Sequence, residues 1–178
     1  MISFLSSLNN RNINLLCGLI CVSSLLIAKF YFEDYLGLEP CYLCITQRAF
    51  IAIAGLLFFI WAVHDPKRLG ARIYALLVLS ATSAGAYFSL KQLYLQSLPE
   101  EQVPQCGPPV DYLFETFSNF EVIAMLLRGD GNCAKIQWEF LSITMPGWVL
   151  LIFIALIAAS ILNLVLSLIH ISEPTRRI

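Results

Sequence analysis

The sequence has few charged residues, and this scarcity is the first constraint on its fold. Only 13% of its 178 residues are charged, whereas a soluble domain carries roughly a quarter. Hydrophobic residues make up 58%, and the mean hydropathy is +0.75. A net charge of −1 provides no basic surface, so nucleic acid is not expected as a partner. These values indicate a protein of the lipid bilayer.

Long apolar segments are abundant, and there are four of them, at about 13–31, 43–63, 73–90 and 148–166. Each is close to the ~20 residues that a helix needs to cross the hydrocarbon, and a helix satisfies its own backbone polar groups there. We predict an all-α membrane protein, a four-transmembrane-helix bundle forming a single domain over 1–165. No small-x-small cleavage site follows the first segment, so we expect a span and not a signal peptide.

The loops differ in charge, and this difference predicts the orientation. Lys and Arg favour the cytoplasmic side, and they gather before the first segment and between the second and third, as Arg11, Lys67, Arg68 and Arg72. Loops 32–42 and 91–147 are acidic, and we expect both outside, with both termini in the cytoplasm. The stretch DYLFETFSNFEVIAMLLRGDG in the long loop predicts a short helix that lies in the outer interface or packs on the loop, ending near Gly129 and Gly131.

The C-terminus has an unusual sequence. Residues 166–176 read LSLIHISEPTR, which is similar to one reading frame of a common sequencing adapter. We expect 166–178 to be a non-native tail, and the alternative is an ordinary cytoplasmic tail.

Cysteines are also scarce: six are too few for a disulfide-dense scaffold, so each position is considered singly. Four fall on the outer, oxidising side of the predicted bundle. The other two lie within the first span and are expected to be small, buried, apolar side chains. The outer four are Cys41, Cys44, Cys106 and Cys133, and the inner two are Cys17 and Cys21.

Cys41 and Cys44 form a C-x-x-C motif where the second span begins. The free N–H groups and the dipole of a helix start stabilise a thiolate, which is the species that attacks disulfides. Zinc is the first alternative, but only one close cysteine pair is present, and we expect no metal. A static disulfide is the second; it suits Cys106 with Cys133 better than the small ring of the C-x-x-C motif.

Arg48 lies four residues after Cys44, so a helix places both on one face. An arginine inside the start of a span is costly and usually functional. Here it would hold a thiolate at Cys44 and donate a hydrogen bond to a quinone carbonyl oxygen. The alternative is an arginine that reaches for lipid phosphate.

Together these residues resemble the disulfide bond formation protein B family, DsbB, over nearly the whole chain. The resemblance rests on P-C-Y-L-C-I-T-Q-R at Pro40–Arg48, Q-C-G-P at Gln105–Pro108, G-N-C-A-K-I-Q-W-E-F at Gly131–Phe140 and I-T-M-P-G-W at Ile143–Trp148. It implies a bacterial inner-membrane protein with its redox cysteines in the periplasm. It also implies a quinone-dependent thiol oxidase, with ubiquinone or menaquinone as cofactor.

The resemblance further implies a relay. Cys106 would be attacked by a periplasmic oxidase resembling DsbA, Cys133 would then attack Cys41, and Cys44 would be left beside the quinone and Arg48. The family carries a histidine and a glutamine near the quinone, four residues apart at the outer end of the third span. Here Gln96 fits the pattern, whereas Gln92 replaces the histidine, and an amide cannot gain a proton near neutral pH.

Two other functions remain open. A structural membrane protein stapled by disulfides would carry the same cysteines, but it would not oxidise added dithiols in a quinone-dependent way. A quinone reductase of the vitamin K epoxide reductase type would also have four helices and a C-x-x-C motif. That motif should then lie in the last helix and not at the start of the second.

Overall fold

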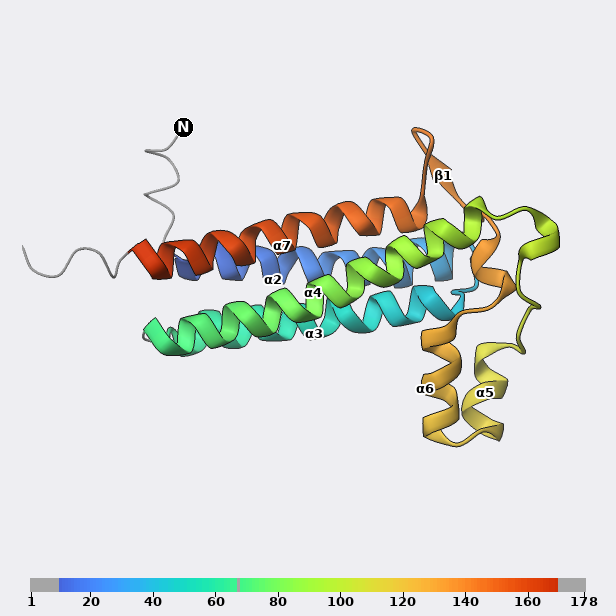
Figure 1. The fold of residues 1–178 in the computed structure, drawn as a ribbon, viewed down its shortest axis with the longest axis horizontal. Coiled ribbons are helices and arrows are strands. Elements are labelled where there is room, and N and C mark those ends of the chain that lie inside the picture. The colour runs from blue at the N-terminus through green and yellow to red at the C-terminus, as the bar shows by residue number, and fades with distance from the viewer. Residues whose placement is uncertain (1–9, 67, 170–178) are drawn as a thin grey trace, which may run out of the picture.

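A computed structural model describes residues 10–66 and 68–169, and four long helices dominate it. They are α2 (Asn10–Leu26), which continues as the π-helix η1 (Ile27–Tyr35), α3 (Tyr42–His64), α4 (Arg68–Ser97) and α7 (Met145–Ile169). Each is long and apolar enough to cross a membrane, over 10–35, 42–64, 69–97 and 145–165. The helices run side by side (Figure 1), which confirms the predicted four-helix membrane bundle.

Of the predicted non-native tail, residues 170–178 lie outside the described residues. Residues 166–169 form the end of α7. The domain boundary at 165 therefore stays a prediction.

Small residues allow the helices to pack closely. The most extensive contacts join α4 to α7, α2 to α3, and α3 to α4. Phe58, Val78 and Phe153, one from each of α3, α4 and α7, are fully buried in the core between them. A Cβ at Gly85 would collide with the ring of Phe153, so this glycine permits the close approach of α4 and α7. Such fit matters in a bilayer, where lipid tails are as apolar as the core.

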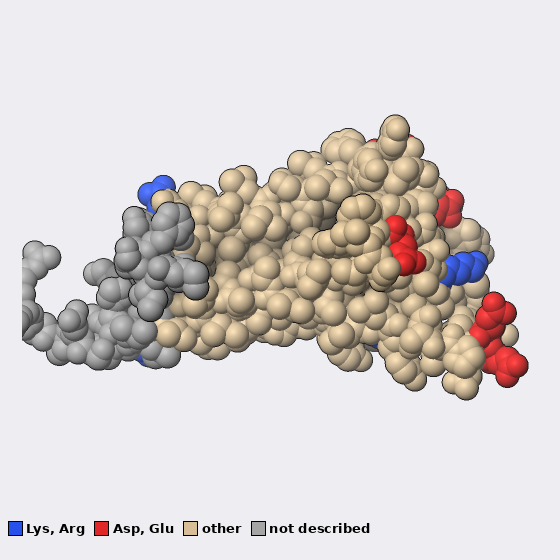
Figure 2. All heavy atoms as spheres, turned by 90° about the horizontal axis from the view of Figure 1, so that it is seen from above, with Lys and Arg blue, Asp and Glu red and all other residues tan. Residues whose placement is uncertain are grey.

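Charged side chains avoid the middle of the bundle. In the space-filling view, Lys, Arg, Asp and Glu gather toward the two ends of the molecule, and the central band of this face is uncharged (Figure 2). Within the bundle, a buried polar contact joins the first and last spans, where Asn163 Nδ2 donates to Asn14 Oδ1 (2.9 Å). An uncharged middle is what a hydrocarbon environment requires.

The loop end of the bundle contains short elements. The 3₁₀ helix η2 (Glu100–Gln102) precedes α5 (Val110–Thr116) and α6 (Asn119–Arg128), and the 3₁₀ helix η3 (Gly131–Ala134) leads to a hairpin of β1 (Glu139–Phe140) and β2 (Ile143–Thr144). Figure 1 shows α5 and α6 running across the axis of the bundle.

The single helix expected in the long loop is instead two helices, and the break has a local cause. Ser118 and Glu121 form a capping box: the Ser118 backbone N–H donates to Glu121 Oε2 (3.0 Å), and a second helix therefore starts there. The helix ends at Gly129, which adopts φ 73°, as expected. Val122 packs inward while Phe120 and Ile123 stay exposed. This apolar outer face is compatible with an interfacial position, which stays a prediction.

Candidate functional site

The C-x-x-C motif occupies the start of α3. Cys41 is the N-cap residue, in extended conformation, and Cys44 lies in the first turn. Their Sγ atoms are 2.8 Å apart, and both are free thiols. Cys41 is buried and Cys44 partly buried. The first-turn N–H groups have no partner within the helix, so the structure places both sulfurs at the positive end of the helix dipole.

Gln92 of α4 reaches across to this motif. Its Nε2 donates to Cys41 Sγ (3.3 Å) and to Cys44 Sγ (3.4 Å), and its Oε1 accepts a bond from Gln47 Nε2 (2.7 Å). Both glutamines are buried. Gln92, the residue in the position of the family's histidine, thus contacts the thiols directly.

Gln96 lies one turn further along α4. Its Oε1 accepts a hydrogen bond from Thr144 Oγ1 (2.9 Å). It lines a small cavity of about 20 Å³ together with Cys41, Cys44 and Gln92.

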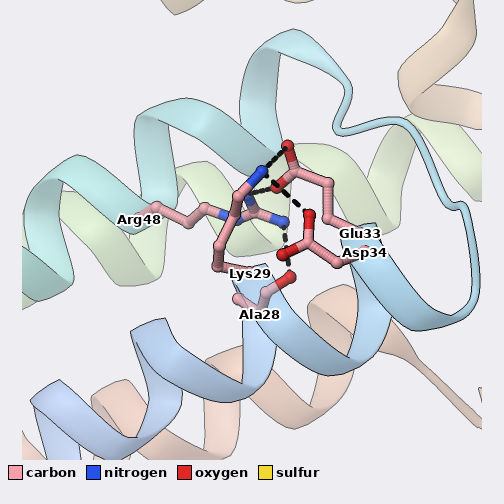
Figure 3. Close-up of polar contacts among 5 residues, drawn as sticks. All are labelled: Ala28, Lys29, Glu33, Asp34 and Arg48. Atoms are coloured by element: carbon pink, nitrogen blue, oxygen red, sulfur yellow. Dashed lines mark hydrogen bonds and ion pairs between the residues drawn. The ribbon is translucent and has the colours of Figure 1, made fainter.

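Arg48 reaches toward η1, which continues the first span (Figure 3). Its Nη1 donates to Glu33 Oε2 (2.7 Å) and its Nη2 to the Ala28 carbonyl oxygen (3.3 Å). Lys29 also pairs with Glu33 and with Asp34, each at 3.1 Å (Figure 3). Cys44 and Arg48 lie one turn apart on α3, as the spacing predicts. The carboxylate partner of Arg48 is Glu33, which belongs to another helix, η1.

A cavity of about 320 Å³ lies beside these groups, between the end of α2, η1, α3, α7 and the two residues that precede the hairpin, Gln137 and Trp138. Cys44, Gln47 and Arg48 line it on one side. Its other walls are mostly apolar and include Leu25, Ala28, Phe32, Leu38, Ile51, Trp138, Met145, Trp148, Val149 and Ile152. Of the four loop-side cysteines, Cys44 is the one that lines this cavity. A volume near 300 Å³ with few polar groups is typical of a small-molecule site.

Cys133 of η3 also contacts Cys41. Hydrogen bonds to Cys133 and Cys44, together with burial, raise the pKa of the Cys41 thiol. The same Cys41 contact lowers the pKa of Cys133, although burial opposes it. Cys133 is fully buried, whereas Cys106 is exposed. The structure therefore gathers Cys44, Cys41 and Cys133 in a row, with one exposed cysteine outside it.

Cys17 and Cys21 lie in the core of the bundle, as expected. Both are buried in the apolar cluster that α2 shares with α3, α4 and α7. Cys21 packs on Gly55, where an added Cβ would come within 2.8 Å of Cys21 Cβ. Their place in the bundle separates them from the loop-side cysteines.

Sequence reasoning missed three contributors to the site. Gln47 is three residues after Cys44 on α3, so helical spacing could have identified it. From the sequence, Glu33 was interpreted only as one of the acidic residues of a loop. In the structure it lies in η1 and pairs with Arg48 of α3. Asp130 accepts a bond from the Cys133 thiol (3.3 Å), and its position three residues before that cysteine was the available sequence signal.

Known proteins match this chain over most of its length. Residues 10–163 match the family described as Disulfide bond formation protein DsbB. Proteins named Disulfide bond formation protein B are 45% identical in Hahella chejuensis, over 85% of this chain and 91% of the relative, and 44% in Saccharophagus degradans, over 79% and 84%. The relative from Marinobacter nauticus is 45% identical over 78% of this chain and 82% of its own. With four spans, a C-x-x-C motif at the start of α3 and a second cysteine pair in the long loop, the chain belongs to the DsbB family of disulfide-forming membrane proteins.

Proposed function

We propose that this protein is a quinone-dependent thiol oxidase that reoxidises a periplasmic dithiol oxidase resembling DsbA. The observation that carries the proposal is the row of sulfurs: Cys133 contacts Cys41, Cys41 contacts Cys44, and Cys44 lines an apolar cavity. Thiolates pass electrons by attacking a neighbouring disulfide sulfur. A row of this kind can therefore carry an electron pair from a loop to a cavity.

The relay starts at the exposed cysteine. With both pairs oxidised, a thiolate of the partner attacks Cys106 Sγ, the Cys106–Cys133 bond breaks, and Cys133 is released. Cys133 then attacks Cys41 Sγ, a Cys133–Cys41 bond forms, and Cys44 leaves as a thiolate at the cavity wall. The partner's second thiol completes its own disulfide and frees Cys106, which reforms its bond with Cys133 and leaves Cys41 and Cys44 reduced.

The cavity fits a quinone headgroup by its chemistry. Its walls are mostly apolar, and its polar groups include the Arg48 guanidinium, which can donate to a carbonyl oxygen. When bound, a quinone would accept two electrons and two protons. The Arg48 charge would stabilise the negative charge that develops there. The contacts of Gln92 favour a different role from the quinone ligand suggested by the family pattern: it would hold the two sulfurs in place.

The proposed setting is the bacterial inner membrane, with both loops in the periplasm and both termini in the cytoplasm. Lys67 lies between α3 and α4, and Arg68 and Arg72 lie at the start of α4, in line with the preference of positive charge for the cytoplasm. A reporter that works only in the cytoplasm should be active when fused after Arg72 and inactive when fused within 98–110. The reverse pattern would place the cysteines in a reducing compartment and refute the function.

The direct test is anaerobic mixing of the purified, oxidised protein with a reduced DsbA-like oxidase. With ubiquinone or menaquinone present, we expect many turnovers of partner oxidation with equal formation of quinol. Without quinone, oxidation should stop after the protein's own disulfides are consumed. A protein stapled by static disulfides would oxidise no partner under either condition.

A further inference from the structure

Asp130 joins the two cysteine segments of the long loop. It is the N-cap residue of η3 and is 4% exposed. Its Oδ2 accepts bonds from the Gly107 backbone N–H (2.9 Å) and from Asn132 Nδ2 (2.8 Å). Its Oδ1 accepts the bond from Cys133 Sγ (3.3 Å). One buried carboxylate thus holds the residue next to Cys106 and touches the sulfur of Cys133.

The backbone around this carboxylate is tightly packed. The Gly131 N–H donates to the Gln105 carbonyl oxygen (3.2 Å), and a Cβ at Gly131 would lie 3.2 Å from Cys106 Sγ. Tyr42 Oη donates to the Pro108 carbonyl oxygen (2.5 Å), which fastens the same segment to α3. The position of Asp130 is therefore held by contacts that do not depend on a bond between the two loop cysteines.

Cys133 leaves Cys106 as a thiolate and becomes a thiol when it takes up a proton. We propose, building on the relay above, that Asp130 is a catalytic residue that accepts this proton again when the Cys133 thiol attacks Cys41. The step is balanced. The Cys133–Cys41 bond forms as the Cys41–Cys44 bond breaks, and Cys44 leaves as a thiolate. The proton of the Cys133 thiol passes to the Asp130 carboxylate, which becomes a neutral carboxyl. No other oxidant or reductant takes part.

The need for this acceptor follows from what Cys41 does in each state. As a free thiol, Cys41 donates to Cys133 and lowers its pKa. In a disulfide with Cys44 it has no proton to donate. The backbone N–H groups of Asp130 and Leu43 still favour the Cys133 thiolate, whereas the hydrogen bond to the Asp130 carboxylate favours the thiol. Burial shields this thiol from solvent bases. The carboxylate at 3.3 Å is then the base in direct contact with it.

The titratable groups near this pair include the Cys41 thiol, the Tyr42 phenol of α3 and Cys106 beside Gly131. They also include Lys135, which donates to Asn132 Oδ1 (3.2 Å).

The test isolates the exchange in a Cys106→Ala protein, in which Cys133 is always free. The protein is prepared at pH 4 with Cys41–Cys44 oxidised and without quinone. It is then moved to pH 5–8, acid-quenched at intervals and mapped by mass spectrometry. Asp130→Asn retains an oxygen for Gly107 and Asn132 but loses the base, whereas Asp130→Glu restores a carboxylate. Asn132→Ala is the matched control, because it removes one bond to Asp130 and leaves the charge.

We expect Asp130→Asn to form the Cys133–Cys41 bond at least about 100-fold more slowly at pH 7, because general-base assistance is worth roughly 10²–10⁴. Its rate should rise about tenfold per pH unit, since hydroxide must now remove the proton. Proteins that keep Asp130, or that carry Asp130→Glu or Asn132→Ala, should have shallower profiles. Equal rates or equal slopes in the carboxylate proteins and in Asp130→Asn would overturn the proposal. If the unchanged Asp130 protein forms no Cys133–Cys41 bond at any pH, the relay order itself is wrong.

Discussion

Replacing Arg48 tests the link between the cavity and the thiol chemistry. In Arg48→Met the cavity loses its guanidinium, and any acceptor bound there loses a charge-assisted hydrogen bond worth about 1.5–3 kcal/mol. At 1.36 kcal/mol per decade, this predicts a rise of roughly ten- to a hundredfold in the apparent KM for quinone. The Cys44 thiolate would also lose a nearby positive charge, so quinone reduction should slow.

Arg48→Lys should have a smaller effect. The two Nη atoms of Arg48 reach Glu33 and the Ala28 carbonyl oxygen at once. An ammonium lacks this planar fork and is more strongly hydrated. We expect Lys to raise the KM for quinone while it preserves most of the rate. Glu33→Ala should fall between the two variants, because it leaves the charge in place but removes the anchor that orients the guanidinium.

The assay is a steady-state quinone titration alongside single-turnover thiol exchange with the partner. Exchange at Cys106 should be unchanged, because that residue is exposed in the loop. Arg128→Met is the matched control, an exposed arginine at the end of α6 that does not line the cavity. A normal KM and a normal rate of quinone reduction in Arg48→Met would refute the assignment and leave Arg48 as a structural partner of Glu33.

Three further predictions concern other parts of the chain. Cys106→Ser should abolish electron acceptance from the partner yet leave the C-x-x-C pair able to reduce quinone, measured by mixing the reduced variant with quinone alone; partner oxidation at the normal rate would contradict the relay. Replacing Cys17 and Cys21 by Ala should preserve turnover and cost roughly 1 kcal/mol of stability each, and a large loss of turnover would place them in the reaction. Hydrogen bonds from Ser118 lower the pKa of Glu121, so the ionised form stabilises α6: that stability is present above the ordinary glutamate pKa and is lost as the pH falls through the lowered value. Amide exchange in α6 should therefore accelerate in acid, and in Glu121→Gln it should be faster already at neutral pH and insensitive to this titration.

The four spans could be predicted because a bilayer demands long apolar segments, but their ends could not. Hydropathy falls at Lys29, Glu33 and Asp34, where the first span was predicted to stop near residue 31. The helix nevertheless continues as η1 to Tyr35, because these charges pair with one another and with Arg48. Pairing between charges of one helical turn, and across to a neighbouring helix, is a tertiary effect that a hydropathy profile does not contain.

The cysteines could be sorted from the sequence because each group falls in a different topological zone. Spacing along one helix also placed Arg48 one turn from Cys44. It could not predict the contacts made by residues of other elements: Glu33 of η1 with Arg48, Gln92 of α4 with Cys41, and Asp130, the N-cap of η3, with Cys133. Each of these contacts joins segments that are distant in sequence or held by a loop conformation, so only the folded chain reveals them.

On the proposed relay, burial fixes the order in which the sulfurs react. Cys106 is exposed, so a soluble protein can attack it, whereas Cys41 and Cys133 are buried and no external thiol can reach them directly. On this relay electrons enter the C-x-x-C pair through Cys133. The same burial removes the solvent that would normally take a thiol proton. Once Cys133 has become a thiol, the relay therefore needs a base of its own, and the carboxylate of Asp130 lies against that sulfur.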